Sequence, residues 1–152
     1  MKRIFIAALA VVGLMLSSAM QANAEAIVVV TTQNQVITFD SATPGTTSIP
    51  AAISGLVSTS ETIVGIDRRP SNGLIYGVSS QGRIYTITET GAATLVSTIS
   101  GATLSGGIFG VDFNPMVDST PNTASLRIVN NGAGGNQNLA VNVQTGAATV
   151  QT

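Results

Sequence analysis

The alternation of apolar and polar residues along this chain is typical of short β-strands separated by turns. Residues 26–32 (AIVVVTT) form an apolar, β-branched run, and residues 83–88 (RIYTIT) alternate between apolar and polar side chains. Clusters containing Gly, Asn or Pro stand between such runs, and these residues favour turns. Beyond the first 24 residues, no helical periodicity lasts for three turns. The pattern therefore predicts an all-β fold.

One pair of strands and its turn occurs more than once. Residues 82–96 (GRIYTITETGAATLV) and 137–150 (QNLAVNVQTGAATV) each place a strand before a Thr-Gly turn, and a second strand then opens with Ala-Ala-Thr. Residues 34–49 (NQVITFDSATPGTTSI) form a third, more divergent copy. This internal similarity indicates a repeat architecture.

A second phrase precedes two of these copies. It reads VGIDRRP at residues 64–70 and FGVDFNP at residues 109–115. The aspartates in it, Asp67 and Asp112, stand about 45 residues apart, which is the length of a four-stranded propeller blade. The spacing predicts a β-propeller-like domain of about three antiparallel blades.

The predicted blades cover residues 26–53, 61–99 and 107–151. Counted from the inside out, the second and third blades have four predicted strands each, whereas the first has three and lacks its innermost strand. Closed propellers have about four blades or more, so this chain would leave sheet faces and edges uncovered. Copies of the chain could complete the ring by association, the sequence could be the truncated half of a longer propeller, or the strands could close as a small sandwich.

Residues 1–24 have the features of a cleavable signal peptide. A basic start precedes an apolar run over residues 4–16, and Ala22 and Ala24 form a small-x-small cleavage site. We expect the mature chain to be residues 25–152, exported to the periplasm or the extracellular space of a bacterium. No membrane anchor is expected after cleavage.

The composition narrows the possible functions. After cleavage the chain would keep four arginines and no lysine against seven acidic residues, a net charge of about −3. This balance argues against nucleic acid as a partner, since no basic patch is available to neutralise phosphates. The chain has no Cys and no His, so it lacks disulfides, the commonest general base and the commonest metal ligand. These absences favour a role without catalysis.

The longest repeated phrases resemble a known family. VGIDRRPSNGLIYGVSSQGRIYTITETGAATLV (residues 64–96), FGVDFNP and LRIVNNGAGGNQNLAVNVQTGAATV (residues 126–150) are similar in order and spacing to a secreted bacterial family known as domain of unknown function 4394. The resemblance covers nearly all of residues 26–152 and corresponds to the N-terminal half of the family domain. It implies propeller-like repeats and supplies no catalytic residues.

Two departures from the family pattern stand out. Arg68 replaces a residue that is usually aromatic, so the resemblance implies that one apolar contact is lost there. Residues 116–123 are extra residues before the strand that contains Arg127.

The best candidate site residues are Asp67, Asp112 and Asn114. Each aspartate ends a predicted inner strand, just before a turn that contains proline. Inner-strand carboxylates that converge near a propeller axis could bind a cation such as Ca²⁺, or a polyol, although Ca²⁺ prefers several oxygens close together. The alternative is that each aspartate caps its own turn by accepting backbone N–H groups.

Three other features have a structural and a functional interpretation. Arg68 and Arg69 could contact an anion or a glycan, or could be solvated turn residues. Tyr76 and Tyr85 could form a carbohydrate-stacking platform, or could pack at the blade periphery with half-buried rings. Residues 130–138 (NNGAGGNQN) lack the Lys-Ser/Thr pair of a phosphate-binding loop, which predicts a flexible hairpin loop.

The sequence as a whole favours an exported, non-enzymatic module for binding or for surface and extracellular assembly. Self-association through open sheet edges is the expected partnership, and a glycan or another extracellular ligand is an additional candidate. One alternative is the truncated half of a longer propeller. Another is a divalent-cation-dependent propeller hydrolase that uses the inner-strand aspartates.

Overall fold

The computed structural model describes residues 24–132 and 135–151 of the chain. The predicted signal peptide therefore lies outside the described residues, apart from the exposed Ala24. The described residues form eleven β-strands and one short helix. They are β1 (Ala26–Val30), β2 (Gln35–Asp40), β3 (Ala51–Ala52), β4 (Ile63–Arg68), β5 (Ile75–Ser79), β6 (Arg83–Ile87), β7 (Ala93–Thr98), β8 (Phe109–Phe113), α1 (Pro115–Asp118), β9 (Leu126–Gly132), β10 (Gly135–Val141) and β11 (Ala148–Val150).

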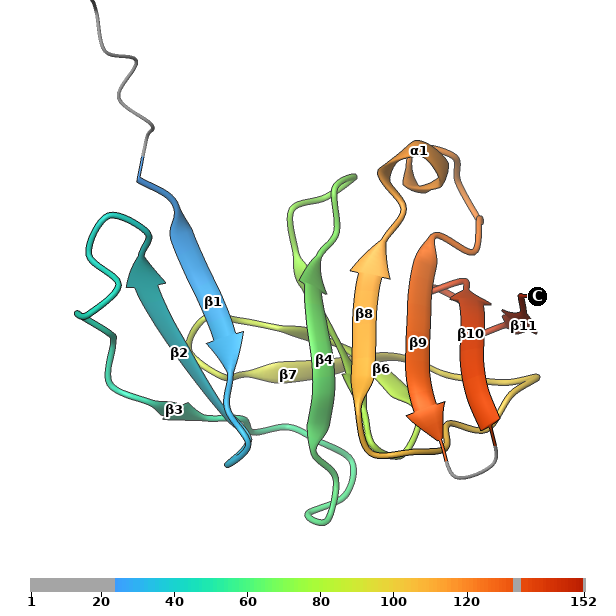
Figure 1. The fold of residues 1–152 in the computed structure, drawn as a ribbon, viewed down its shortest axis with the longest axis horizontal. Coiled ribbons are helices and arrows are strands. Elements are labelled where there is room, and N and C mark those ends of the chain that lie inside the picture. Colours follow the sequence, from blue (N-terminus) through green and yellow to red (C-terminus); the bar gives the residue numbers. More distant parts are fainter. Residues whose placement is uncertain (1–23, 133–134, 152) are drawn as a thin grey trace, which may run out of the picture.

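The strands form three antiparallel sheets, which confirms the predicted all-β fold and its division into units of three, four and four strands. The first sheet has the order β1-β2-β3, the middle sheet β4-β5-β6-β7 and the third sheet β8-β9-β10-β11. In Figure 1 the first sheet lies at the left and the third at the right, with β4 between β1 and β8. Strands β4 and β8 lie side by side although they belong to different sheets.

Two similar bridges at the periphery join each sheet to the next. Ser54, after β3, forms a parallel bridge with Ala92, and Ser100, after β7, forms one with Ala147. Because the bridges are equivalent, β3 is the counterpart of the end of β7, and β1 is the counterpart of β5 and β9. The first sheet thus holds counterparts of the second, third and fourth strands of the other sheets. The described residues supply it with no counterpart of β4 or β8, as the repeat predicted.

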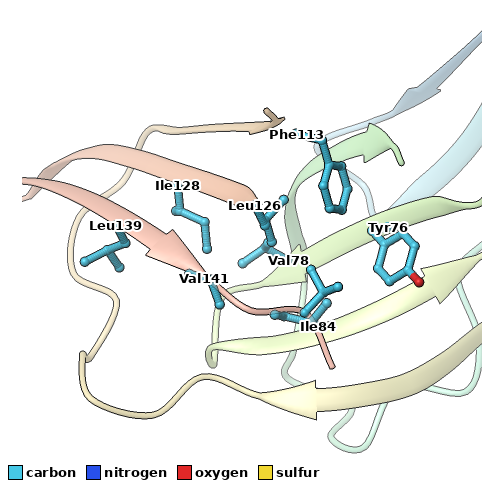
Figure 2. Close-up of a cluster of buried hydrophobic side chains, with 9 residues drawn as sticks. Tyr76, Val78, Ile84, Phe113, Leu126, Ile128, Leu139 and Val141 are labelled. Carbon is cyan, nitrogen blue, oxygen red and sulfur yellow. The ribbon is translucent and has the colours of Figure 1, made fainter. Parts of the chain in front are cut away.

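A hydrophobic cluster covers each face of the middle sheet, which explains why every residue of β5 is buried. The first cluster, shown in Figure 2, joins the middle and third sheets; its buried members are Tyr76, Val78, Ile84, Phe113, Leu126, Ile128, Leu139, Val141 and Val143. The second joins the first and middle sheets, with Val36, Ile63, Tyr85 and Ile87 as its buried members. Side chains alternate between the two faces of a strand, so adjacent Ile84 and Tyr85 belong to different clusters.

Two segments for which the sequence predicted no helix or strand contain regular structure. The extra segment at residues 116–123 begins inside α1, whose N-cap is Asn114. The predicted hairpin loop at residues 130–138 is wrong over most of its length, because β9 and β10 continue into it and Asn131 pairs with Asn136. Asparagine and glycine predict loops by propensity, but cross-strand pairing overrides this preference here. No helix in the described part of the chain is long and apolar enough to cross a membrane.

Candidate functional site

Asp67 joins β4 to β8, the first strands of two neighbouring sheets. Its Oδ1 accepts the N–H of Arg68 at 2.8 Å, and its Oδ2 accepts the N–H of Phe113 in β8 at 2.7 Å. The first bond is local, as the turn-capping interpretation expected. The second crosses to the next sheet, a role that reasoning from one strand at a time missed.

The same two strands also approach closely at a glycine. A Cβ built on Gly65 in β4 would overlap the side chain of Val111 in β8, and the Val111 Cβ lies 3.0 Å from that position. Gly65 therefore allows Val111 to pack between the sheets. The repeated phrase x-Gly-x-Asp thus describes a strand-to-strand contact: the glycine receives an apolar side chain and the aspartate receives a backbone N–H.

Asp112, the counterpart of Asp67, lies in a different environment. It is exposed in β8, on the face of the third sheet that points away from the middle sheet. Its cross-strand neighbour on that face is Arg127, and Gly110 and the 44 % exposed Val129 form the next pair along the two strands. Among the described residues, its carboxylate accepts no hydrogen bond comparable to that from Phe113 to Asp67.

Asn114, the third candidate, is used locally. Its side-chain Oδ1 accepts the N–H of Met116 at 3.1 Å and caps α1. Within residues 24–132 and 135–151, no three acidic, histidine or cysteine side chains gather into a cluster suited to a metal ion. The cation site at Asp67, Asp112 and Asn114 stays a prediction, and the structure gives Asp67 and Asn114 capping roles.

Arg69 is a buried residue, so its interpretation as a solvated turn residue is wrong. Its Nε donates to Asp118 Oδ1 at 2.7 Å, and its side chain is only 10 % exposed. The guanidinium also lies over the rings of Tyr76 and Phe113, at 5.7 and 5.8 Å from their centroids. An arginine suits this place because its planar cation packs on aromatic faces.

Asp118 completes this cluster from the extra segment. Its Oδ1 also accepts the hydroxyl of Ser125 at 2.7 Å, and its Oδ2 accepts the N–H of Ser71 at 3.0 Å. Burial raises the pKa of Asp118, but the hydrogen bonds from Ser125, Ser71 and Arg69 outweigh it and lower the pKa to about 2. The extra segment thus supplies the carboxylate that pairs with Arg69.

A second buried carboxylate, Glu61, lies near the opposite end of the middle sheet. Its oxygens accept hydrogen bonds from Ser79, from the Tyr85 hydroxyl at 2.9 Å and from Arg83 at 3.2 Å. Burial raises the pKa of Glu61, but these bonds and one from the Ser58 N–H outweigh it and lower the pKa. Sequence reasoning missed this group, since its partners are spread over three segments of the chain.

Both tyrosines are buried rather than half-buried or exposed. Tyr76 is 4 % exposed and Tyr85 is fully buried. Tyr76 meets Phe113 edge to face at a centroid distance of 5.4 Å, and the Tyr85 hydroxyl accepts the N–H of Val57 while it donates to Glu61. Neither ring is available as a platform for a carbohydrate.

Among the described residues, β1 pairs with β2 on one side and with no strand on its other edge. The N–H of Thr31 donates to Gln35 O, and that of Ser41 donates to Glu25 O. By antiparallel alternation, the backbone groups of Ala26, Val28 and Val30 therefore point away from β2. A groove of about 180 Å³ adjoins this edge, lined by Ala26, Val28, Ile66, Asp67, Arg68 and Ile75.

The outer face of the first sheet is apolar. We define it by Ile27, Val29, Ile37 and Phe39, which form the cross-strand pairs Val29–Ile37 and Ile27–Phe39. The alternate residues Val28, Val30 and Val36 pack toward the middle sheet, so this face points the opposite way. Ile27 is 37 % exposed, and the other three are partly exposed. The face combines large apolar side chains with an adjoining strand edge.

Comparisons with known proteins agree with the repeated phrases. Searches of curated proteins and of solved structures found no significant match. A family model described as "Domain of unknown function (DUF4394)" matches residues 35–152. This match covers most of the chain, including the middle and third sheets, and the chain therefore belongs to the DUF4394 family.

Proposed function

We propose that this protein is an exported, non-enzymatic, propeller-like module that acts by binding and assembly through its first sheet. The three sheets would be blades of an incomplete propeller. The observation that carries the proposal is the first sheet itself, which combines an apolar outer face with a strand edge that has no backbone partner within residues 24–132 and 135–151. Uncovered apolar sheet surface of this kind typically marks an interaction site.

The polar side chains support a role without catalysis. The candidate acid Asp67 has both oxygens occupied by backbone N–H groups, and Asp118 and Glu61 are held in buried ion pairs. With no histidine and no cysteine in the chain, these groups have no partner of the kind that general acid–base or nucleophilic catalysis uses. They stabilise the packing between sheets instead.

Self-association through the outer face of the first sheet is the simplest form of this function, because a two-fold axis lets one apolar face pack on its own copy. We expect light scattering on a sizing column to give a dimer mass for residues 25–152. Ile37→Lys, which places a charge in that face, should give a monomer with an unchanged circular dichroism spectrum.

The matched control is Val129→Lys, which places the same charge on the outer face of the third sheet and should stay dimeric. A folded monomer of the unaltered chain at every concentration would contradict self-association. Heterogeneous aggregates that both variants leave unchanged would favour the truncated half of a longer propeller.

A further inference from the structure

We propose that the groove between β1 and β4 binds an extended strand of the pattern apolar-Gly-apolar-Asp, supplied by a partner polypeptide. The strand would add to the edge of β1 and take the place that β4 and β8 occupy in their own sheets. This inference rests on the proposed binding function and names the class of partner. Strand addition to an open sheet edge is a common mode of peptide recognition.

The first argument is the backbone of β1. Its counterpart β5 pairs with β4 through Tyr76 and Val78, which lie opposite Asp67 and Gly65. The residues of β1 at the same positions are Val28 and Val30, whose N–H and C=O groups point away from β2. A strand in the groove would therefore place its aspartate opposite Val28 and its glycine opposite Val30.

The second argument is the surface that β4 offers to such a strand. Gly65 in β4 receives Val111 of β8, and the counterpart of Val111 in β4 is Ile66, which lines the groove. The glycine of a bound strand would receive Ile66 in the same way. The aspartate of the bound strand would lie next to the N–H of Arg68, which is the counterpart of the Phe113 N–H. In the structure the Arg68 N–H donates to Asp67, the preceding residue.

The third argument concerns the source of the strand. In the chain the pattern occurs at residues 64–67 and 109–112, and both copies are paired within their own sheets. The N-terminal residues 1–23 contain no aspartate, so they cannot supply it. A second copy of residues 1–152 has no free strand of this pattern to offer, so the strand would come from polypeptide outside these residues.

A synthetic peptide copied from residues 107–115 (GIFGVDFNP) is the probe. In β8 the Asn114 N–H donates to Ser125 O at 2.9 Å, so by alternation the Asp112 N–H also points to β9 and the Val111 N–H does not. We expect the labelled peptide to bind the chain in a fluorescence anisotropy titration. N-methylation at Asp112 should weaken binding about two- to tenfold, the value of one lost hydrogen bond.

The matched control is the same peptide N-methylated at Val111, which should bind as the parent does. Gly110→Leu in the peptide should also weaken binding, because the leucine would collide with Ile66. Absence of binding at millimolar peptide, or equal binding of the two methylated peptides, would overturn the inference. The titration uses the monomeric Ile37→Lys chain alongside the unaltered one. If the peptide binds neither chain while the unaltered chain is still a dimer, the partner strand is refuted and self-association is not.

Discussion

Asp118→Asn should remove a large share of the stability of this fold. The substitution leaves the Arg69 guanidinium, whose side chain is 10 % exposed, without its carboxylate. Breaking a buried ion pair from one side costs about 3–5 kcal/mol, against a total of about 5–15 kcal/mol for a domain. Urea unfolding followed by circular dichroism measures the loss.

The matched control is the ion pair of Arg68, the residue before Arg69. Arg68 pairs with Glu89 at 3.2 Å, but both side chains are about half exposed. Glu89→Gln makes the same chemical change in an exposed pair and should alter the free energy of unfolding by at most about 1 kcal/mol. Equal effects of the two substitutions would contradict the structural role of the Arg69–Asp118 pair.

Lowering the pH should cause part of the loss of stability that Asp118→Asn causes. Its pKa is about 2 in the folded chain against a usual 3.8, so the folded state holds this proton less tightly than the unfolded state does. The resulting stabilisation, roughly 2 kcal/mol at 1.36 kcal/mol per unit, is present above about pH 4 and is lost as the pH falls toward 2. Asp118→Asn should flatten this part of the stability profile.

Gly146→Ala should weaken the contact between the third sheet and the middle sheet. Gly146 has a φ of +76°, and a Cβ built there would overlap the carbonyl oxygen of Thr98 at the end of β7. Its own carbonyl accepts the N–H of Ser100 at 2.9 Å, which is part of the peripheral bridge. Left-handed strain and the overlap together should cost about 2–4 kcal/mol in urea unfolding.

Gly73→Ala is the control for the strain alone. Gly73 has a similar φ of +70°, but nothing lies within 4 Å of a Cβ built on it. We expect a loss of about 1 kcal/mol at this turn. If Gly146→Ala cost no more than Gly73→Ala, the close approach of the sheets at Gly146 would not be important for stability.

The sequence was most informative where strand pattern and turn chemistry coincide. The alternation of residues 83–88 and the Thr-Gly-Ala-Ala-Thr phrases predicted the hairpins that the structure contains. The glycine in this phrase also has a role in packing, because Gly91 and Gly146 each lie close to the backbone of the preceding sheet. The lengths of the two turns were not predicted. The strand pairs Ile87–Ala93 and Val141–Ala148 show that the turn that contains Gly146 is one residue longer than the turn that contains Gly91.

The contacts between sheets were much harder to predict. Arg69 stands beside a proline in a polar turn, and only the distant Asp118 explains its burial. Asp67 ends its strand as a turn cap would, yet one of its bonds reaches a residue 46 positions away. Strand pairing and turns have local sequence signals, whereas contacts across sheets depend on which sheets become neighbours. The incomplete first sheet was predictable because it required only counting strands within repeats.

Amide hydrogen exchange of β1 tests the central claim, that the described residues give the first sheet no counterpart of β4 or β8 and leave the edge of β1 open. In the dilute monomeric chain, the amides of Val28 and Val30 should exchange orders of magnitude faster than those of their counterparts Tyr76 and Val78, which pair with β4. The same two amides should become protected when the peptide of residues 107–115 is added. Equal protection of β1 and β5 in the monomer without peptide would mean that the chain covers this edge itself and would contradict the account.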